Sequence, residues 1–329
     1  MFTELSMHEV SLVKKIVFGF IVLAFIGITT LLSFFLFVVR APSGVQYPVK
    51  ITVESGQGAQ SIAQELFEHG IVRQSKFTQN LIVSKGGEKS IQAGTYIFKK
   101  PMYVFSVAEK IATGDFGYVP VKMTVPEGTN SKRLAVIIHS KFPHIATSTF
   151  ETLARENEGY LFPETYFFAP EATELEILDR MKVIFNRKIE PIKPQIVTSG
   201  KTLSEILTIA SILEGEVQTA EDRAMVADLL ERRMQIGMPL QVDATLVYTT
   251  GKTSATLTLK DLQTNGPYNT YTNKGLPPTP ISNPGLDSIL AVLNPIPNQY
   301  LFYLSDKDGI TRFSKTYAEH LKLKAKYLR

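Results

Sequence analysis

The stretch IVFGFIVLAFIGITTLLSFFLFVV, residues 16–39, decides how this chain is organised. It carries no charge and is almost entirely apolar. About 20 apolar residues cross the hydrocarbon layer of a membrane as one helix, whereas the core of a cleaved signal peptide needs only about 7–15 and is followed by small residues. Here the aromatic run at 34–37 leads directly to Val39 and Arg40. We therefore predict an uncleaved transmembrane helix at 16–39.

The charges on either side of this segment predict its direction. Lys14 and Lys15 precede it, and the single Arg40 follows it. Because basic flanks favour the cytoplasmic side of a membrane, we expect residues 1–15 to form a cytoplasmic tail. The rest of the chain is then a body outside the cytoplasm.

Composition limits what this body does. A chain of 329 residues is longer than one hydrophobic core usually serves, so we expect two folded units after the membrane segment. The 35 Lys and Arg residues against 31 Asp and Glu residues give a net charge of only +4, without basic runs, which argues against a nucleic-acid partner. The absence of cysteine excludes disulfides, thiolate metal sites and cysteine nucleophiles.

The first predicted unit follows a linker at 40–48 and covers residues 49–115. Its pattern is β-α-α-β and a further helix: strands at 49–53 and 94–98, and helices at 61–69, 76–84 and 104–113. The segment Ile51–Gly56, leading into Ser61–Leu66, resembles a LysM-like domain. That resemblance implies contact with glycan. The alternative is a spacer that only sets the height of the body above the membrane.

The second predicted unit, residues 116–329, has an α+β pattern. We expect strands at 119–125, 300–304 and 310–313, and helices near 131–140, 149–157, 173–188, 203–217, 220–236 and 315–327. Its loops at 160–166 and 268–271 are rich in aromatic and polar residues, which suits a sugar-binding cleft. The fold class is therefore α+β, with a transmembrane helix, a small LysM-like domain and a larger catalytic domain.

Several kinds of catalytic site are disfavoured by the residues present. The five histidines show neither metal-ligand spacing nor a nucleophile elbow nearby, and the chain has no glycine-rich phosphate loop. We expect no cofactor and no metal. A carboxylate is the remaining candidate for the chemistry.

The helix predicted at 203–217 places one carboxylate in an unusual position. At about 100° per residue, its apolar residues form a single stripe. The stripe consists of Leu203, Ile206, Leu207, Ala210, Leu213 and Val217. Glu214 falls inside the stripe, whereas Glu205 and Glu216 fall away from its centre. Ile209 and Ile212 also lie on that side, so it does not face solvent alone, but its charges look ordinary. Because an apolar environment disfavours the charged form, we expect a raised pKa for Glu214, as suits a general acid.

A structural role for Glu214 is the alternative. A buried glutamate also serves to pair with an arginine, such as Arg223 or Arg232, and so to brace two helices.

Five blocks of sequence, in order, resemble the YceG-like family of endolytic murein transglycosylases. They are Glu158–Tyr166, Ala210–Glu216, Arg232–Asp243, Tyr268–Tyr271 and Gly275–Gly285. The resemblance runs from the membrane helix to Phe313–His320 at the C-terminal end.

The resemblance implies a bacterial enzyme, anchored in the inner (plasma) membrane, that cuts peptidoglycan glycan strands internally and terminates their elongation. Glu214 matches the catalytic acid/base, and cell-wall synthases are possible partners. The residues that match substrate-binding positions are Glu164, Glu216, Gln241, Asp243, Tyr268 and Asn269. Glu216 is also the alternative carrier of the chemistry. Two residues depart from the family pattern: Gly215 replaces a long residue such as lysine, and Ala244 replaces a proline.

Two other classes of function stay open at this point. A non-catalytic scaffold would use the same cleft to hold glycan or a synthase, with Glu214 as a bracing charge. A conventional hydrolase would need a second carboxylate, such as Glu164 or Asp243, to activate water.

Overall fold

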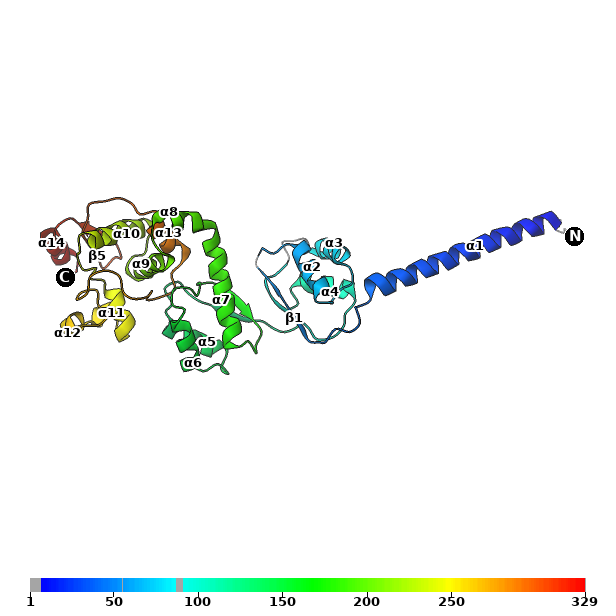
Figure 1. Cartoon of the computed structure of the whole chain (residues 1–329), viewed down its shortest axis with the longest axis horizontal. Coiled ribbons are helices and arrows are strands. Elements are labelled where there is room, and N and C mark those ends of the chain that lie inside the picture. Colours follow the sequence, from blue (N-terminus) through cyan, green and yellow to red (C-terminus); the bar gives the residue numbers. More distant parts are fainter. Residues whose placement is uncertain (1–6, 55, 87–90, 329) are drawn as a thin grey trace. The chain divides into compact units, whose positions relative to one another are not determined.

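The computed structural model describes residues 7–54, 56–86 and 91–328 (Figure 1). Part of the predicted tail, residues 1–6, and Ser55 of the LysM-like motif lie outside the described residues. The contacts divide the chain into a first unit, Met1–Val121 with Phe167–Pro170, and a second unit, Lys122–Tyr166 with Glu171–Arg329.

The N-terminal helix α1 (Met7–Phe34) continues into a π-helical turn, η1 (Phe35–Val39). Within the described residues, Val17–Val39 is the one helical segment that is by itself long and apolar enough to cross a membrane. A signal sequence near an N-terminus satisfies the same criteria. Large apolar side chains along it, such as Phe20 and Leu31, are each 70% exposed. An apolar surface of this extent indicates an environment other than water.

The rest of the first unit contains the predicted β-α-α-β pattern, which we call the module. Strand β1 (Val49–Val53) pairs antiparallel with β2 (Gly94–Phe98), and Val49 lies opposite Phe98. The module's helices are α2 (Ala59–Glu68), α3 (Ser75–Gly86) and α4 (Val104–Thr113). Alternate residues of β1, Ile51 and Val53, enter a core that α2 and α4 complete. The order of elements is as predicted, whereas the likeness to LysM domains stays a prediction.

The second unit is mainly helical, with short strands. Its helices are α5 (Ser131–Lys141), α6 (Thr147–Arg155), α7 (Glu174–Ile189), α8 (Lys193–Ser199), α9 (Leu203–Glu216), α10 (Ala220–Gln235), α11 (Asp243–Thr250), α12 (Leu259–Gln263), α13 (Leu286–Leu293) and α14 (Tyr317–Tyr327). Strands β3 (Val121–Thr124) and β4 (Thr165–Phe168) form one two-stranded sheet, although Val121, Phe167 and Phe168 count with the first unit. Strands β5 (Phe302–Ser305) and β6 (Thr311–Ser314) form another. The mixed α and β composition agrees with the predicted class.

Helix α9 lies in the interior of the second unit (Figure 1) and packs against α10, α11 and α13. It begins with a capping box, in which Thr202 and Glu205 exchange hydrogen bonds. The predicted single apolar stripe is too narrow a description. Ile209 and Ile212, which the helical wheel puts opposite the stripe, are 2% and 0% exposed. Because neighbouring helices surround α9, its central turns are buried on every side.

The loop between α12 and α13 is fixed to two distant segments by Asn283, which is completely buried. Its Oδ1 accepts hydrogen bonds from the backbone N–H groups of Gly159 and Leu161, both at 2.9 Å. Its Nδ2 donates to the carbonyl of Thr129 at 2.9 Å, and the two residues also form a backbone bridge. One side chain therefore joins the loop before α13, the loop after α6 and the turn before α5.

We expect Asn283→Ala to destabilise the second unit. The substitution leaves two buried N–H groups without a partner, each at a cost of about 1–3 kcal/mol. For a unit of this size, about 1 kcal/mol corresponds to about 2–4 °C, so Tm should fall by about 4–24 °C. Circular dichroism of the full chain in detergent measures the change. The exposed Asn265 provides the control, and an equal fall in Tm for Asn265→Ala would contradict the role of Asn283.

Candidate active site

Glu214 lies in the last turn of α9, and its side chain is only 6% exposed. Its Oε1 accepts a hydrogen bond from Nη2 of Arg223 at 3.0 Å. Its Oε2 accepts from the backbone N–H of Gly285 at 3.0 Å and from the hydroxyl of Ser288 at 2.7 Å. A buried carboxylate without such donors costs several kcal/mol. The site is therefore built to hold a carboxylate at this position.

Of the two arginines that were candidates to pair with Glu214, Arg223 on α10 is the one that does so. Arg232 instead contacts Asp228 and the carbonyl of Asn298. The Nε–H of Arg223 is buried and has no hydrogen-bond partner within the described part of the chain. Buried donors are nearly always satisfied in proteins.

A second carboxylate, Glu127, lies next to Glu214 and was not among the predicted site residues. It sits in the turn between β3 and α5. A Cβ added to Gly285, whose N–H binds Glu214, would lie 1.9 Å from Oε1 of Glu127. A Cβ added to Gly128 would lie 3.3 Å from Cγ of Glu214. Because Gly128 and Gly285 have no side chain, the turn after β3 and the loop before α13 can lie close to these two carboxylates.

The environment of Glu127 favours its protonated form. Partial burial raises the pKa of Glu127, and the nearby negative charge of Glu214 raises it further, while Arg223 acts in the opposite direction. Groups whose pKa values are displaced by burial and by a specific charged neighbour are common at functional sites.

Glu216, two residues after Glu214, belongs to a separate polar network. Its carboxylate accepts hydrogen bonds from the backbone N–H of Ala244 at 3.1 Å and from the hydroxyl of Tyr303 at 3.0 Å. Burial raises the pKa of Glu216. The expectation of an ordinary charge at Glu216 is wrong, because α11 and β5 supply these contacts on the side of α9 away from the stripe.

Two other predicted residues lie in or beside the network around Glu216. Asp243 is close enough for its charge to raise the pKa of Glu216, and its Oδ1 accepts a hydrogen bond of 2.5 Å from the hydroxyl of Tyr271. Gln241 has a φ of 52°, a left-handed conformation that is uncommon for a residue with a side chain, and its N–H donates to the carbonyl of Thr270. The structure thus brings the loops at 241–243 and 268–271 together.

The side chains of the neighbouring residues Tyr268 and Asn269 have different hydrogen-bond partners. The hydroxyl of Tyr268 forms a 2.8 Å hydrogen bond with that of Thr279, and its ring lies 5.3 Å from the ring of Tyr248. Asn269 is 2% exposed, and its Nδ2 donates to three backbone carbonyls at the end of α12. Asn269 therefore holds its loop in shape.

Glu164, at the start of β4, is exposed and pairs with Lys188 at 3.3 Å. Its backbone carbonyl accepts from Val125, which precedes the turn that carries Glu127. Glu164 therefore contributes to positioning this turn through its backbone.

A further buried carboxylate, Glu158, anchors the start of α5. Both of its oxygens accept from the backbone N–H of Ser131 at 3.0 Å, and the hydroxyl of Tyr248 donates to it at 3.3 Å. Burial raises the pKa of Glu158. No sequence pattern distinguished it from the rest of its block.

Comparison with known proteins identifies the family to which these residues belong. The model of the YceG-like family matches residues 51–326. The chain belongs to the YceG-like family.

Named relatives and a solved structure agree with this family. An endolytic murein transglycosylase of Bacillus subtilis (strain 168) is 33% identical over 307 residues, 85% of either chain. Another, from Streptococcus pneumoniae serotype 2 (strain D39), is 27% identical over 314 residues, which cover 83% of this chain and 57% of the relative. The crystal structure of a yceG-like protein from Listeria monocytogenes is 28% identical, with a TM-score of 0.57, and the match covers 85% of this chain and 100% of that one.

Gly215 and Ala244, the two predicted departures from the YceG-like pattern, face each other. A Cβ added to Gly215 would lie 3.3 Å from Cβ of Ala244, a close contact between α9 and the first turn of α11. Glycine in a helix costs about 1 kcal/mol relative to alanine, yet α9 continues through Gly215 to Glu216. The absence of a side chain at 215 therefore allows α11 to pack closely beside the candidate acid.

We expect Glu214→Gln to lower the pKa of Glu127, because the substitution removes a negative charge that raises it. The pKa of Glu158 should not change, since burial dominates its shift and Glu214 is not among its causes. Carbon-13 NMR of side-chain carboxyl groups, recorded against pH, measures both. An unchanged pKa for Glu127 would mean that the two carboxylates do not interact.

Proposed function

We propose that this YceG-like protein is an endolytic murein transglycosylase that cuts peptidoglycan glycan strands between MurNAc and GlcNAc, with Glu214 as acid/base. The observation that carries the assignment of Glu214 is its buried carboxylate at the end of α9, held by three donors from two other segments. The named relatives support the reaction.

A single carboxylate is sufficient for this reaction because the substrate carries its own nucleophile. Glu214 protonates the glycosidic oxygen, and the bond from that oxygen to the anomeric carbon of the muramic sugar breaks. The 6-hydroxyl of the same sugar then attacks the anomeric carbon and gives its proton to Glu214. The product is a 1,6-anhydromuramic end, and the acid is restored.

Glu127 and Arg223 both lie beside this carboxylate. Arg223 pairs with Glu214 at 3.0 Å, and the negative charge of Glu214 raises the pKa of Glu127. Glu127 is also the second carboxylate that a conventional hydrolase would need, because Glu164 is paired with Lys188 and Asp243 with Tyr271.

Matched substitutions on α9 test the assignment. We expect Glu214→Gln to reduce cleavage by about 10²–10⁴-fold, the usual contribution of general acid–base catalysis. Glu216→Gln should keep substantial activity, since the glutamine oxygen can accept from the N–H of Ala244 while its NH2 group donates to the hydroxyl oxygen of Tyr303. Mass spectrometry of peptidoglycan digests, with melting curves for both variants, measures the effects. New anhydromuramic ends within former long strands are expected.

Each contrary outcome of this experiment has a defined meaning. Full biological effect of Glu214→Gln would favour the non-catalytic scaffold. Equal loss in both variants, with unchanged Tm, would contradict the choice of Glu214. Reducing muramic ends alone would show that water is the nucleophile, and Glu127 would then be the residue to activate it.

We further propose that α1 and η1 anchor the protein in the plasma membrane, with the body outside the cytoplasm. The apolar length of Val17–Val39 and the lysines before it support this direction. Alkaline phosphatase fused after the C-terminal end should be active, because that enzyme works only when exported. An inactive fusion in a stable protein would reverse the orientation.

A further inference from the structure

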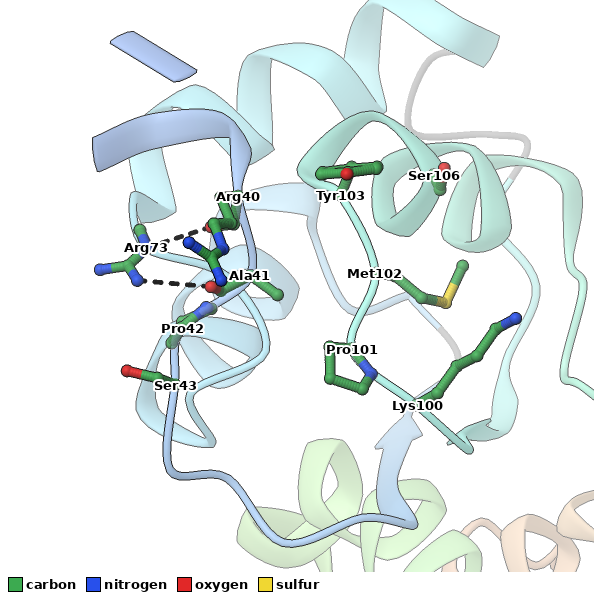
Figure 2. A pocket seen from close by; sticks show the side chains of 10 residues that line it. All are labelled: Arg40, Ala41, Pro42, Ser43, Arg73, Lys100, Pro101, Met102, Tyr103 and Ser106. Atoms are coloured by element: carbon green, nitrogen blue, oxygen red, sulfur yellow. Dashed lines mark hydrogen bonds between the residues drawn. The ribbon is translucent and has the colours of Figure 1, made fainter. Parts of the chain in front are cut away.

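A basic pocket of about 710 Å³ lies where the apolar helix meets the module (Figure 2). Arg40, Arg73 and Lys100 line it, and none of its lining residues is acidic. Figure 2 shows Arg40, Arg73 and Ser43 on one side of the pocket, with Lys100 and Tyr103 on the other. The catalytic proposal makes no use of this pocket.

The pocket lies at the end of the apolar segment. That segment ends at Val39, and Arg40 is the next residue. Arg73 fixes this point to the module, because its Nε donates to the carbonyl of Arg40 at 3.1 Å and its Nη2 donates to that of Ala41 at 3.3 Å. An arginine has five N–H donors, so three are left for a ligand. In a membrane, the pocket would therefore lie at the level of the lipid headgroups.

An apolar groove of about 530 Å³ runs beside the same helix end. Leu31, Phe35 and Val39 line it from the helix, and Phe105 lines it from α4. The ring of Phe35 lies 5.8 Å from that of Tyr103, which also lines the basic pocket. Tyr103 and Phe105 are 54% and 42% exposed. Exposed aromatic residues at such a position are typical of membrane interfaces.

We propose that the pocket binds the headgroup of an anionic phospholipid in the leaflet that the module faces, with an acyl chain in the groove. The inference rests on the membrane anchor of the proposed function. Three cations in a pocket with no acidic residue among its described lining residues complement a lipid phosphate. The groove continues from the apolar surface of the span, and a free phosphate ion would leave it empty.

Binding of the lipid headgroup is tested with the full chain in detergent micelles. Native mass spectrometry should show tighter binding of dioctanoyl phosphatidylglycerol than of dioctanoyl phosphatidylcholine or glycerol phosphate. Lys100→Gln should weaken binding of the anionic lipid about fivefold, as expected for one basic residue near a lipid phosphate. Because Arg73 also holds the linker, Lys100 is the cleaner site. Lys76→Gln, an equal change of charge on α3, is the control.

Binding of the acyl chain in the groove is tested with two matched phenylalanine substitutions. Phe105→Ser should weaken binding of phosphatidylglycerol, whereas Phe67→Ser, at a residue of α2 that is 45% exposed and does not line the groove, should not. Equal binding of the anionic and neutral lipids, or equal loss in both members of either pair, would overturn the proposal. Glycerol phosphate that binds as tightly as the lipid would indicate a phosphate site and would also overturn it.

Failure of this inference is distinguishable from failure of the proposed function. Glu214→Gln should keep lipid binding, and Lys100→Gln should keep glycan cleavage in micelles. Release of the chain from membranes by alkaline carbonate would disprove the anchor, and the lipid site with it. Loss of lipid preference in a chain that stays in the membrane would disprove the lipid site alone.

Discussion

The burial of the Glu214 carboxylate is the constraint on which the arrangement of the second unit depends. A charged group removed from water is tolerated only where hydrogen bonds and an opposite charge replace its hydration. Here the replacements are Arg223 on α10, the backbone N–H of Gly285 at the start of α13, and the hydroxyl of Ser288 within α13. Helices α9, α10 and α13 therefore have to meet at the last turn of α9.

The loop before α13 is held by the same face of α9. Ser211, one turn before Glu214, accepts a hydrogen bond from the N–H of Ile281. Asn283 then ties this loop to Thr129, and the tie brings the turn that carries Glu127 against the carboxylate. The contacts that hold Glu214 thus also determine the position of Glu127. Without the buried amide of Asn283, the turn that carries Glu127 would lose this tie to the loop before α13.

Local patterns explain which parts were predictable. The module strands at 49–53 and 94–98 and the helices at 104–113 and around 203–217 have clear periodicity and end signals, and the structure has them with nearly the same bounds. Helices α11 and α13 were missed for physical reasons. Helix α11 is rich in β-branched residues, which favour strands, and shows no helical period, while α13 has only 8 residues, too few for its period to stand out. The place of Glu127 depends on contacts with residues more than 150 positions away, and the burial of Glu216 depends on Tyr303 and α11. No local pattern contains that information.

Gly215 and Ala244, the two residues predicted to depart from the family pattern, lie close together next to Glu214 and Glu216. A longer side chain at 215 would push α11 away from α9, and Ala244 donates its N–H to Glu216 from that helix. Glu216 in turn binds Tyr303 and lies beside Asp243, which holds Tyr271. The network around Glu216 and the pair formed by Glu214 and Glu127 therefore lie on different sides of the same end of α9. Small residues at 215 and 244 therefore allow α11, with the network around Glu216, to lie close to the last turn of α9.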